Sequence, residues 1–181
     1  MTLTRSLEER LDAVESRQAI TEVLYRYARG WDRRDVEAVE SCFWPESRHR
    51  HGVYDGSSAD FVAFGLSRTA HIKGARHAVT NVIIELDGDR ALSECYFAAI
   101  HHRPNGSGDG DEEYFVEGRF VDLFERRGGE WRIVRREGLN EFERVQPRAP
   151  TAIDDLPPEV RGRRKPEDGL YAMLAEFRGG R

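Results

Sequence analysis

One acidic residue near the end of the first predicted helix, Asp32, is the most informative site for chemistry in the sequence. It lies four residues after Ala28 and eight after Leu24, so it continues the apolar stripe of that helix. A carboxylate that faces a core or a cavity is costly unless it is paired, and pairing with a histidine would orient a general base. The alternative interpretation places Asp32 beyond the helix end, in a solvated turn beside Arg33 and Arg34.

Two histidines and an arginine on predicted strands could act with that carboxylate. His77 shares a strand face with Asn81 and two aliphatic residues, a mixture that is typical of a pocket wall. Adjacent strand residues point in opposite directions, so only one of His101 and His102 can face a pocket, and the small and aromatic neighbours favour His101. Arg136 could hold an anion or a leaving group. In the alternative interpretation, all of these side chains are solvated charges and strand-end histidines.

The positions of these residues depend on three helices and a set of strands. Apolar residues that recur three and four positions apart predict helices over residues 6–30, 36–42 and 57–71. Alternating and β-branched residues predict a short strand and turn over 47–55 and long strands over 75–86, 90–103, 113–126 and 131–143. Helices followed by a meander of four strands predict an α+β fold.

The C-terminal part of the chain has a different composition. Residues 146–168 are rich in proline and charge, so we expect a domain over residues 1–145 and an extended tail over 146–181. The basic cluster 161–165 favours a contact with a partner chain over a nucleic-acid site. A short helix over 169–178 is expected to dock through Leu170, Tyr171, Leu174 and Phe177.

Composition and charge argue against several classes of protein. The net charge of −5 argues against nucleic acid as the main partner. No apolar run is long enough to span a membrane and the N-terminus lacks an apolar signal region, so we expect a cytoplasmic protein without a membrane partner. Cys42 and Cys95 provide no disulfide framework or zinc quartet, and His49 and His51 lack a third ligand at a recognisable spacing, so no metal is expected.

The order of the motifs resembles the SnoaL-like branch of the nuclear transport factor 2-like superfamily. The resemblance covers roughly residues 12–145. It rests on the segments YARGWDRRD (27–35), ARHAVTN (75–81), GRF (118–120) and EWRIVRR (130–136). Members of this superfamily form a cone, in which a curved, mostly antiparallel sheet surrounds a pocket that helices close at the narrow end.

Within that superfamily the sequence is most similar to scytalone dehydratase, hexachlorocyclohexane dehydrochlorinase and bile-acid 7α-dehydratase. The resemblance implies that Asp32 and His77 form a catalytic dyad, that Arg136 is a pocket arginine and that His101 is a second histidine. Trp31 takes the place of one family tyrosine, and Tyr54 is the candidate for another. The expected pocket lining is Tyr27, Trp31, Phe43, Trp44, Phe64, Asn81, Phe97 and Phe120. The resemblance also implies a homotrimer.

These expectations together predict a lyase or an isomerase that needs no metal and no organic cofactor. The dyad would remove a proton from carbon, while Arg136 or the Tyr54 hydroxyl stabilises the developing anion. The aromatic lining predicts a small hydrophobic cyclic or aromatic substrate, and a dehydratase is favoured over an isomerase. Two alternatives are a non-catalytic small-molecule binding protein and a small structural subunit of an aromatic-ring dioxygenase.

Overall fold

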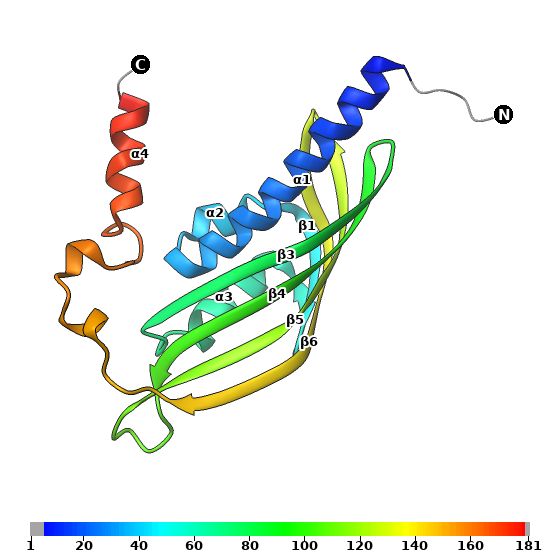
Figure 1. Ribbon diagram of the computed structural model, residues 1–181. Helices are drawn as coiled ribbons and strands as arrows, with labels where there is room; N and C mark the ends of the chain where they lie inside the picture. Colours follow the sequence, from blue (N-terminus) through cyan, green and yellow to red (C-terminus); the bar gives the residue numbers. More distant parts are fainter. Residues whose placement is uncertain (1–5, 180–181) are drawn as a thin grey trace.

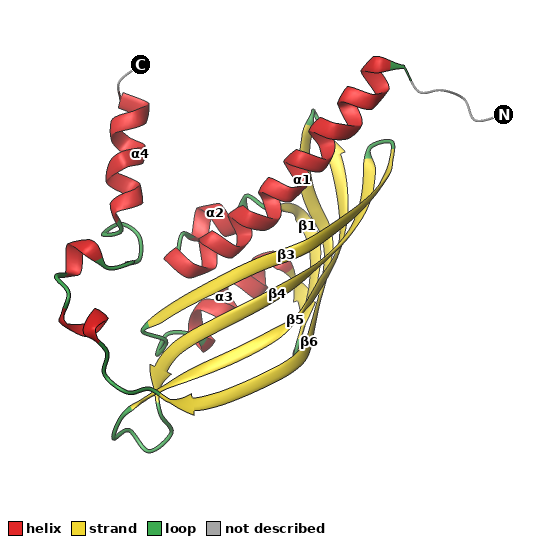
Figure 2. Cartoon of the chain, in the orientation of Figure 1, coloured by secondary structure: helices red, strands yellow, loops and turns green. Residues whose placement is uncertain are grey.

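A computed structural model describes residues 6–179 of the chain (Figure 1). The helices of the main body are α1 (Leu7–Arg33), α2 (Val36–Glu40) and α3 (Ser58–Arg68). The strands are β1 (Phe43–His51), β2 (Tyr54–Ser57), β3 (Gly74–Asp87), β4 (Arg90–Pro104), β5 (Asp111–Arg127) and β6 (Glu130–Pro147). Figure 2 shows the strands curving around the helices, and this arrangement confirms the predicted α+β fold.

The six strands form one mixed sheet in the order β2-β1-β6-β5-β4-β3. Strands β3 to β6 are the predicted antiparallel meander, since each pairs with the next along the chain. Strand β1 lies parallel to β6 and brings His51 opposite Gly138, a pairing that the sequence pattern does not predict. Residues from the first third of the chain therefore share one wall with the last strand.

The long helix α1 ends later than the sequence predicts. It begins with a capping box between Ser6 and Glu9 and ends at Arg33, with Arg34 in the left-handed conformation as its C-cap. Gly30 was expected to end the helix, but it is buried within it. A Cβ at Gly30 would lie 2.6 Å from Val39 Cγ2, so this glycine instead allows α2 to pack closely. Asp32 consequently lies in the last helical turn, and the interpretation that put it beyond the helix is wrong.

A β-bulge in β3 changes which residues face the helices. The pairing with β4 shifts between Thr80 and Ile83, and Asn81 adopts a φ of 53°. Before the bulge, His77 and Val79 face inward. After it, the buried side chain is Ile84, and Asn81 is exposed. The prediction that Asn81 lines the pocket is therefore wrong, because the bulge breaks the alternation on which it depended.

The hydrophobic core lies between α1 and the concave face of the sheet. From α1 it contains Ile20, Leu24 and Tyr27, and from the sheet it contains aromatic and aliphatic side chains such as Phe97, Phe120, Phe124 and Ile133. Aromatic residues fill most of the core nearest to the end of α1. This packing provides rigid walls for a cavity at that end.

The C-terminal tail leaves β6 and returns toward the end of α1. It contains two short 3₁₀ helices, η1 (Ala152–Asp155) and η2 (Pro158–Val160), and then helix α4 (Gly169–Gly179). Figure 1 shows α4 standing apart from the sheet and from α1, and none of its described residues is buried. Of the expected docking residues, Leu170, Tyr171 and Leu174 are half-buried and Phe177 is exposed. No helix among residues 6–179 combines the length and the hydropathy needed to cross a membrane.

Gly118 permits a close approach between β5 and β6. A Cβ at this position would overlap the Leu139 carbonyl oxygen, which belongs to a backbone that cannot easily move. We expect Gly118→Ala to lower the free energy of unfolding by about 3 kcal/mol, because overpacking must shift one strand. Gly74→Ala is the matched control, since a Cβ there meets no atom within 4 Å. Denaturant titration of both variants tests this prediction, and equal midpoints would contradict it.

Candidate active site

Asp32 at the end of α1 and His77 near the start of β3 form a hydrogen-bonded dyad. His77 Nδ1 lies 2.7 Å from Asp32 Oδ1, and the backbone N–H of His77 donates to Asp32 Oδ2 at 3.0 Å. The carboxylate therefore holds both the ring and the backbone of the histidine. Because Asp32 accepts a hydrogen bond from Nδ1, the lone pair lies on Nε2. Both side chains are largely buried, with exposed fractions of 12% and 16%.

The dyad lies beside a cavity of about 220 Å³ at the end of α1. Its apolar and aromatic wall consists of Tyr27, Trp31, Phe61, Gly65, Phe97, Tyr114, Val116 and Phe120. Its polar lining consists of His51, Thr69, His77, His101 and Asn140. The cavity is thus mainly apolar with a few polar groups, which is typical of a site for a small organic molecule. Tyr27, Trp31, Phe97 and Phe120 lie where the sequence analysis expected them.

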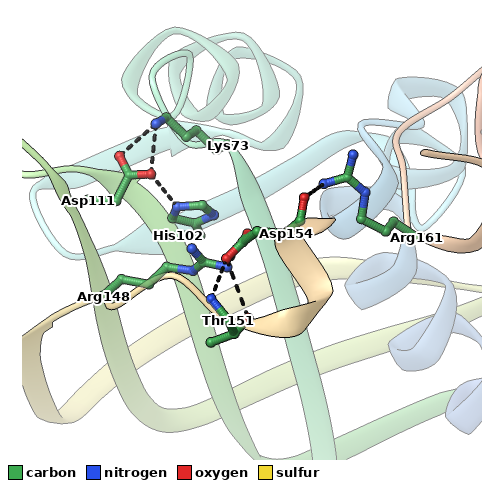
Figure 3. Close-up of polar contacts among 7 residues, drawn as sticks. All are labelled: Lys73, His102, Asp111, Arg148, Thr151, Asp154 and Arg161. Atoms are coloured by element: carbon green, nitrogen blue, oxygen red, sulfur yellow. Dashed lines mark hydrogen bonds and ion pairs between the residues drawn. The ribbon is translucent and has the colours of Figure 1, made fainter. Parts of the chain in front are cut away.

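His101 lies next to His77 in this cavity. The ring centroids are 5.4 Å apart and nearly perpendicular, because His101 on β4 is the diagonal cross-strand neighbour of His77 on β3. Burial, and the neighbouring His77, lower the pKa of His101 to about 4, so its ring is neutral at pH 7. His102 points the other way and contacts Asp111 at 2.7 Å, next to Lys73 (Figure 3).

A second polar pair, His51 and Asn140, lines the same cavity and was missed by the sequence analysis. His51 Nε2 lies 3.0 Å from Asn140 Oδ1. Burial lowers the pKa of His51. A Cβ at Gly138 would lie 2.5 Å from His51 Cγ, so the glycine makes room for this ring. Alternation along β6 puts Arg136, Gly138 and Asn140 on one face, which is a sequence signal for Asn140. The signal does not reveal His51 as the partner, because that depends on the parallel pairing of β1 with β6.

Arg136 does not line the cavity, contrary to expectation. It is fully buried and makes a bidentate ion pair with Asp122 of β5, with contacts of 2.7 and 2.6 Å. Its guanidinium lies 4.0 Å from the Tyr27 ring centroid and 4.2 Å from that of Phe120. These two rings separate Arg136 from the cavity. Burial lowers the pKa of Arg136 and the attraction of Asp122 raises it, and the attraction dominates.

Tyr54 and Phe64 lie outside the cavity as well. The Tyr54 hydroxyl donates to the backbone carbonyl of Ser57 at 2.8 Å, and its ring packs against Phe61 and Phe64. This hydroxyl is occupied in the turn between β2 and α3, so it does not serve as the expected anion-stabilising group. Phe64 lies on the outer face of α3 and is partly exposed.

Phe43 and Trp44 also lie away from the cavity. Phe43 is a core residue that packs edge-on against Tyr27. Trp44 points outward, because neighbouring strand residues alternate between faces. Its indole N–H donates to the Glu125 carbonyl at 3.0 Å, and the guanidinium of Arg132 lies 4.8 Å from its ring. Among residues 6–179, no three His, Cys, Asp or Glu side chains gather as a set of metal ligands.

A family model described as a SnoaL-like domain matches residues 12–137, which is more than half of the chain. The chain belongs to the SnoaL-like family. The match contains both members of the dyad, the five strands β1 to β5 and the first half of β6. A comparison with curated proteins finds no match.

Solved structures share the fold of this SnoaL-like domain. The Kfla4162 protein of Kribbella flavida has a TM-score of 0.66 and 20% identity, covering 73% of this chain and 95% of its own. A candidate scytalone dehydratase of Novosphingobium aromaticivorans has a TM-score of 0.64 and 18% identity, covering 74% and 89%. The LinA-type3 hexachlorocyclohexane dehydrochlorinase of Novosphingobium barchaimii has a TM-score of 0.63 and 21% identity, covering 77% and 94%. At these identities the similarity establishes the fold.

The buried ion pair of this SnoaL-like domain gives a stability prediction. Asp122→Asn leaves the Arg136 charge buried without its counter-ion, so we expect the free energy of unfolding to fall by about 3–5 kcal/mol. The double variant Asp122→Leu with Arg136→Met removes both charges and should cost less than the single variant. Denaturant titration of the two proteins tests this order, and a more stable single variant would contradict it.

His49 gives a prediction about pH. Its ring is fully buried and stacks on Phe61 at 3.6 Å, and burial together with the charge of Arg136 lowers its pKa to about 2. In the unfolded chain His49 is protonated as the pH falls through about 6.5, whereas in the folded chain it stays neutral down to a much lower pH. Protonation therefore favours the unfolded chain, and the free energy of unfolding decreases as the pH falls below about 6.5. For His49 alone, the loss between pH 7 and pH 5 is about 2 kcal/mol.

His49→Phe removes this titrating group and keeps a flat ring against Phe61. We expect the variant to lose less stability between pH 7 and pH 5 than the natural protein, measured by denaturant titration at both pH values. His51 and His101, whose pKa values are also lowered, remain in both proteins and keep part of the dependence. An unchanged loss of stability in the variant would show that His49 does not titrate in this way.

Proposed function

We propose that this protein is a cofactor-independent lyase that catalyses a dehydratase-type elimination on a small hydrophobic cyclic or aromatic substrate. The observation that supports the proposal most strongly is the 2.7 Å contact between Asp32 and His77 beside an apolar cavity. A scaffold has no need for a buried carboxylate that orients a histidine toward a cavity. Two proteins with the same fold are a candidate scytalone dehydratase and a dehydrochlorinase, and both of these names describe eliminations.

In the proposed reaction, His77 is the general base. Its Nε2 takes a proton from a substrate carbon, and the electron pair of that C–H bond forms a double bond as the neighbouring carbon–oxygen bond breaks. The Asp32 carboxylate stabilises the imidazolium that results. The proton then passes from His77 to the departing hydroxide, which leaves as water, so the histidine is restored. An isomerase would return the proton to another carbon through the same imidazolium.

The neutral His101 and the His51–Asn140 pair would orient the substrate in this reaction. His101 has a pKa of about 4, so at pH 7 it donates a neutral hydrogen bond and is not a strong acid. Asn140 and His51 lie across β6 and β1 and offer polar atoms away from the dyad. The apolar walls would hold the ring of the substrate between these groups. The expected homotrimer remains a prediction that light scattering would test.

The dyad gives the test of this proposal. A panel of cyclic β-hydroxyketones is incubated with the protein, and the conjugated enone is followed by its absorbance. We expect His77→Asn to lower kcat/KM about 10³-fold or more and Asp32→Asn to lower it by a similar factor, as expected for a general base and its orienting carboxylate. His71→Asn is the matched control, because His71 is an exposed histidine outside the cavity. Saturable binding of the panel without product would contradict the lyase and support a binding protein.

A further inference from the structure

A small hollow of about 30 Å³ opens beside the dyad, and two arginines line it. It shares Trp31, His77 and His101 with the main cavity, so the two spaces meet at the proposed base. Arg34 enters the hollow from the C-cap of α1, and Arg164 enters it from the C-terminal tail. We call this hollow the mouth of the site, and cationic side chains lie at its edge.

Backbone carbonyl groups hold both guanidinium groups in place. Arg34 Nη2 donates to the carbonyl of Thr69, and Arg164 Nη2 donates to the carbonyl of Ile72. Both acceptors lie in the short connection between α3 and β3, so the two cations are positioned by the same segment. Each guanidinium has five donors, and these contacts use only one nitrogen of each.

The tail is attached firmly enough to place Arg164. The backbone N–H of Lys165 donates to the Arg33 carbonyl at 2.8 Å, and Lys165 Nζ contacts Asp35 and Glu37 at 2.9 and 2.7 Å. Asp168 lies 3.5 Å from Arg33. The basic cluster 161–165 therefore contacts its own chain, where the sequence analysis expected a partner.

Earlier parts of the tail are held along the strand ends as well (Figure 3). Arg148 forms an ion pair with Asp154 at 2.7 Å, and the Asp154 carbonyl accepts a bond from Arg161. The backbone N–H of Arg148 donates to the carbonyl of Asp111, whose side chain pairs with Lys73 and His102. This route carries the chain from β6 to the mouth of the site.

Arg34 and Arg164 have no carboxylate partner among residues 6–179, unlike the neighbouring cations. Arg33 pairs with Asp168, and Lys165 pairs with two acidic residues, while Asp32 is occupied by His77. Burial and the positive charge of Arg34 lower the pKa of Arg164. Two like charges that lie near each other without a counter-ion are unfavourable, and an anion between them would remove that cost.

We propose that the natural substrate carries a carboxylate, which binds between Arg34 and Arg164 while its hydrophobic ring lies in the cavity against His77. Guanidinium groups bind planar carboxylates through paired hydrogen bonds, and the small hollow suits one such group. The charge of Asp32 is outnumbered here by two cations, so the mouth keeps a net attraction for an anion. The inference rests on the proposed function for its reaction, but the binding it describes does not require turnover.

The probe pair 1-naphthoate and 1-naphthamide tests this inference, because the two molecules share a ring system and differ in charge. Isothermal titration calorimetry measures Kd for the natural protein, Arg34→Gln, Arg164→Gln and Arg163→Gln. We expect naphthoate to bind at least 10-fold more weakly to the first two variants, with naphthamide changed less than 2-fold. Arg163→Gln is the matched control, since this adjacent side chain is exposed and lines neither space.

Three results would overturn the inference: no binding of naphthoate to the natural protein, equal losses for the carboxylate and the amide, or an equal loss in Arg163→Gln. Lys165→Gln removes the ion pairs with Asp35 and Glu37 that hold the tail, but it keeps Arg164. The Kd of this variant therefore measures the effect of tail attachment alone. A selective loss for naphthoate in Arg164→Gln that exceeds the loss in Lys165→Gln supports the charge itself. Calorimetry on His77→Asn separates this inference from the proposed reaction, because the variant lacks the base but keeps both arginines. If His77→Asn still prefers naphthoate to naphthamide and the natural protein shows no elimination activity, the carboxylate site stands and only the lyase is refuted.

Discussion

The concave side of this fold depends on the ion pair between Arg136 and Asp122. Both side chains are fully buried, and two hydrogen bonds join β6 to β5 in the middle of the sheet. The rings of Tyr27 and Phe120 cover the guanidinium and at the same time form the floor of the cavity. A charge in this position is tolerated only with its partner and its aromatic cover. Arg136 and Asp122 therefore fix the positions of Tyr27 and Phe120 in the cavity, although neither charged residue lines the cavity itself.

Sequence patterns predicted the elements that depend on local periodicity. The long first helix, the β3–β6 meander and the helix near the C-terminus all lie close to their expected ranges, because apolar spacing within one element is visible in the sequence. The pairing of β1 with β6 could not be read in the same way, because it joins segments nearly ninety residues apart, such as His49 and Arg136. The positions of His51 and Asn140 follow from that pairing.

The candidate site shows the same division. Asp32 and His77 lie together as the family motifs implied, and His101 rather than His102 faces the cavity because of simple alternation along β4. Alternation predicted the wrong face for Asn81, because a bulge reverses the faces of β3. For Arg136, alternation along β6 gave no sign of its partner Asp122 on β5, which holds the guanidinium away from the cavity. Tyr54 was expected in the site only because of the family resemblance, and in the structure its hydroxyl donates to the nearby Ser57 carbonyl.

The parallel contact between β1 and β6 also constrains how the chain folds. The meander forms from strands that follow one another, whereas β1 must wait for the last strand, and contacts between distant segments form slowly. During synthesis the histidines of β1 leave the ribosome long before β6 exists to pair with their strand. The wall that contains His51 is thus completed only after the last strand has been made, and until then the paired edge of β1 stays open.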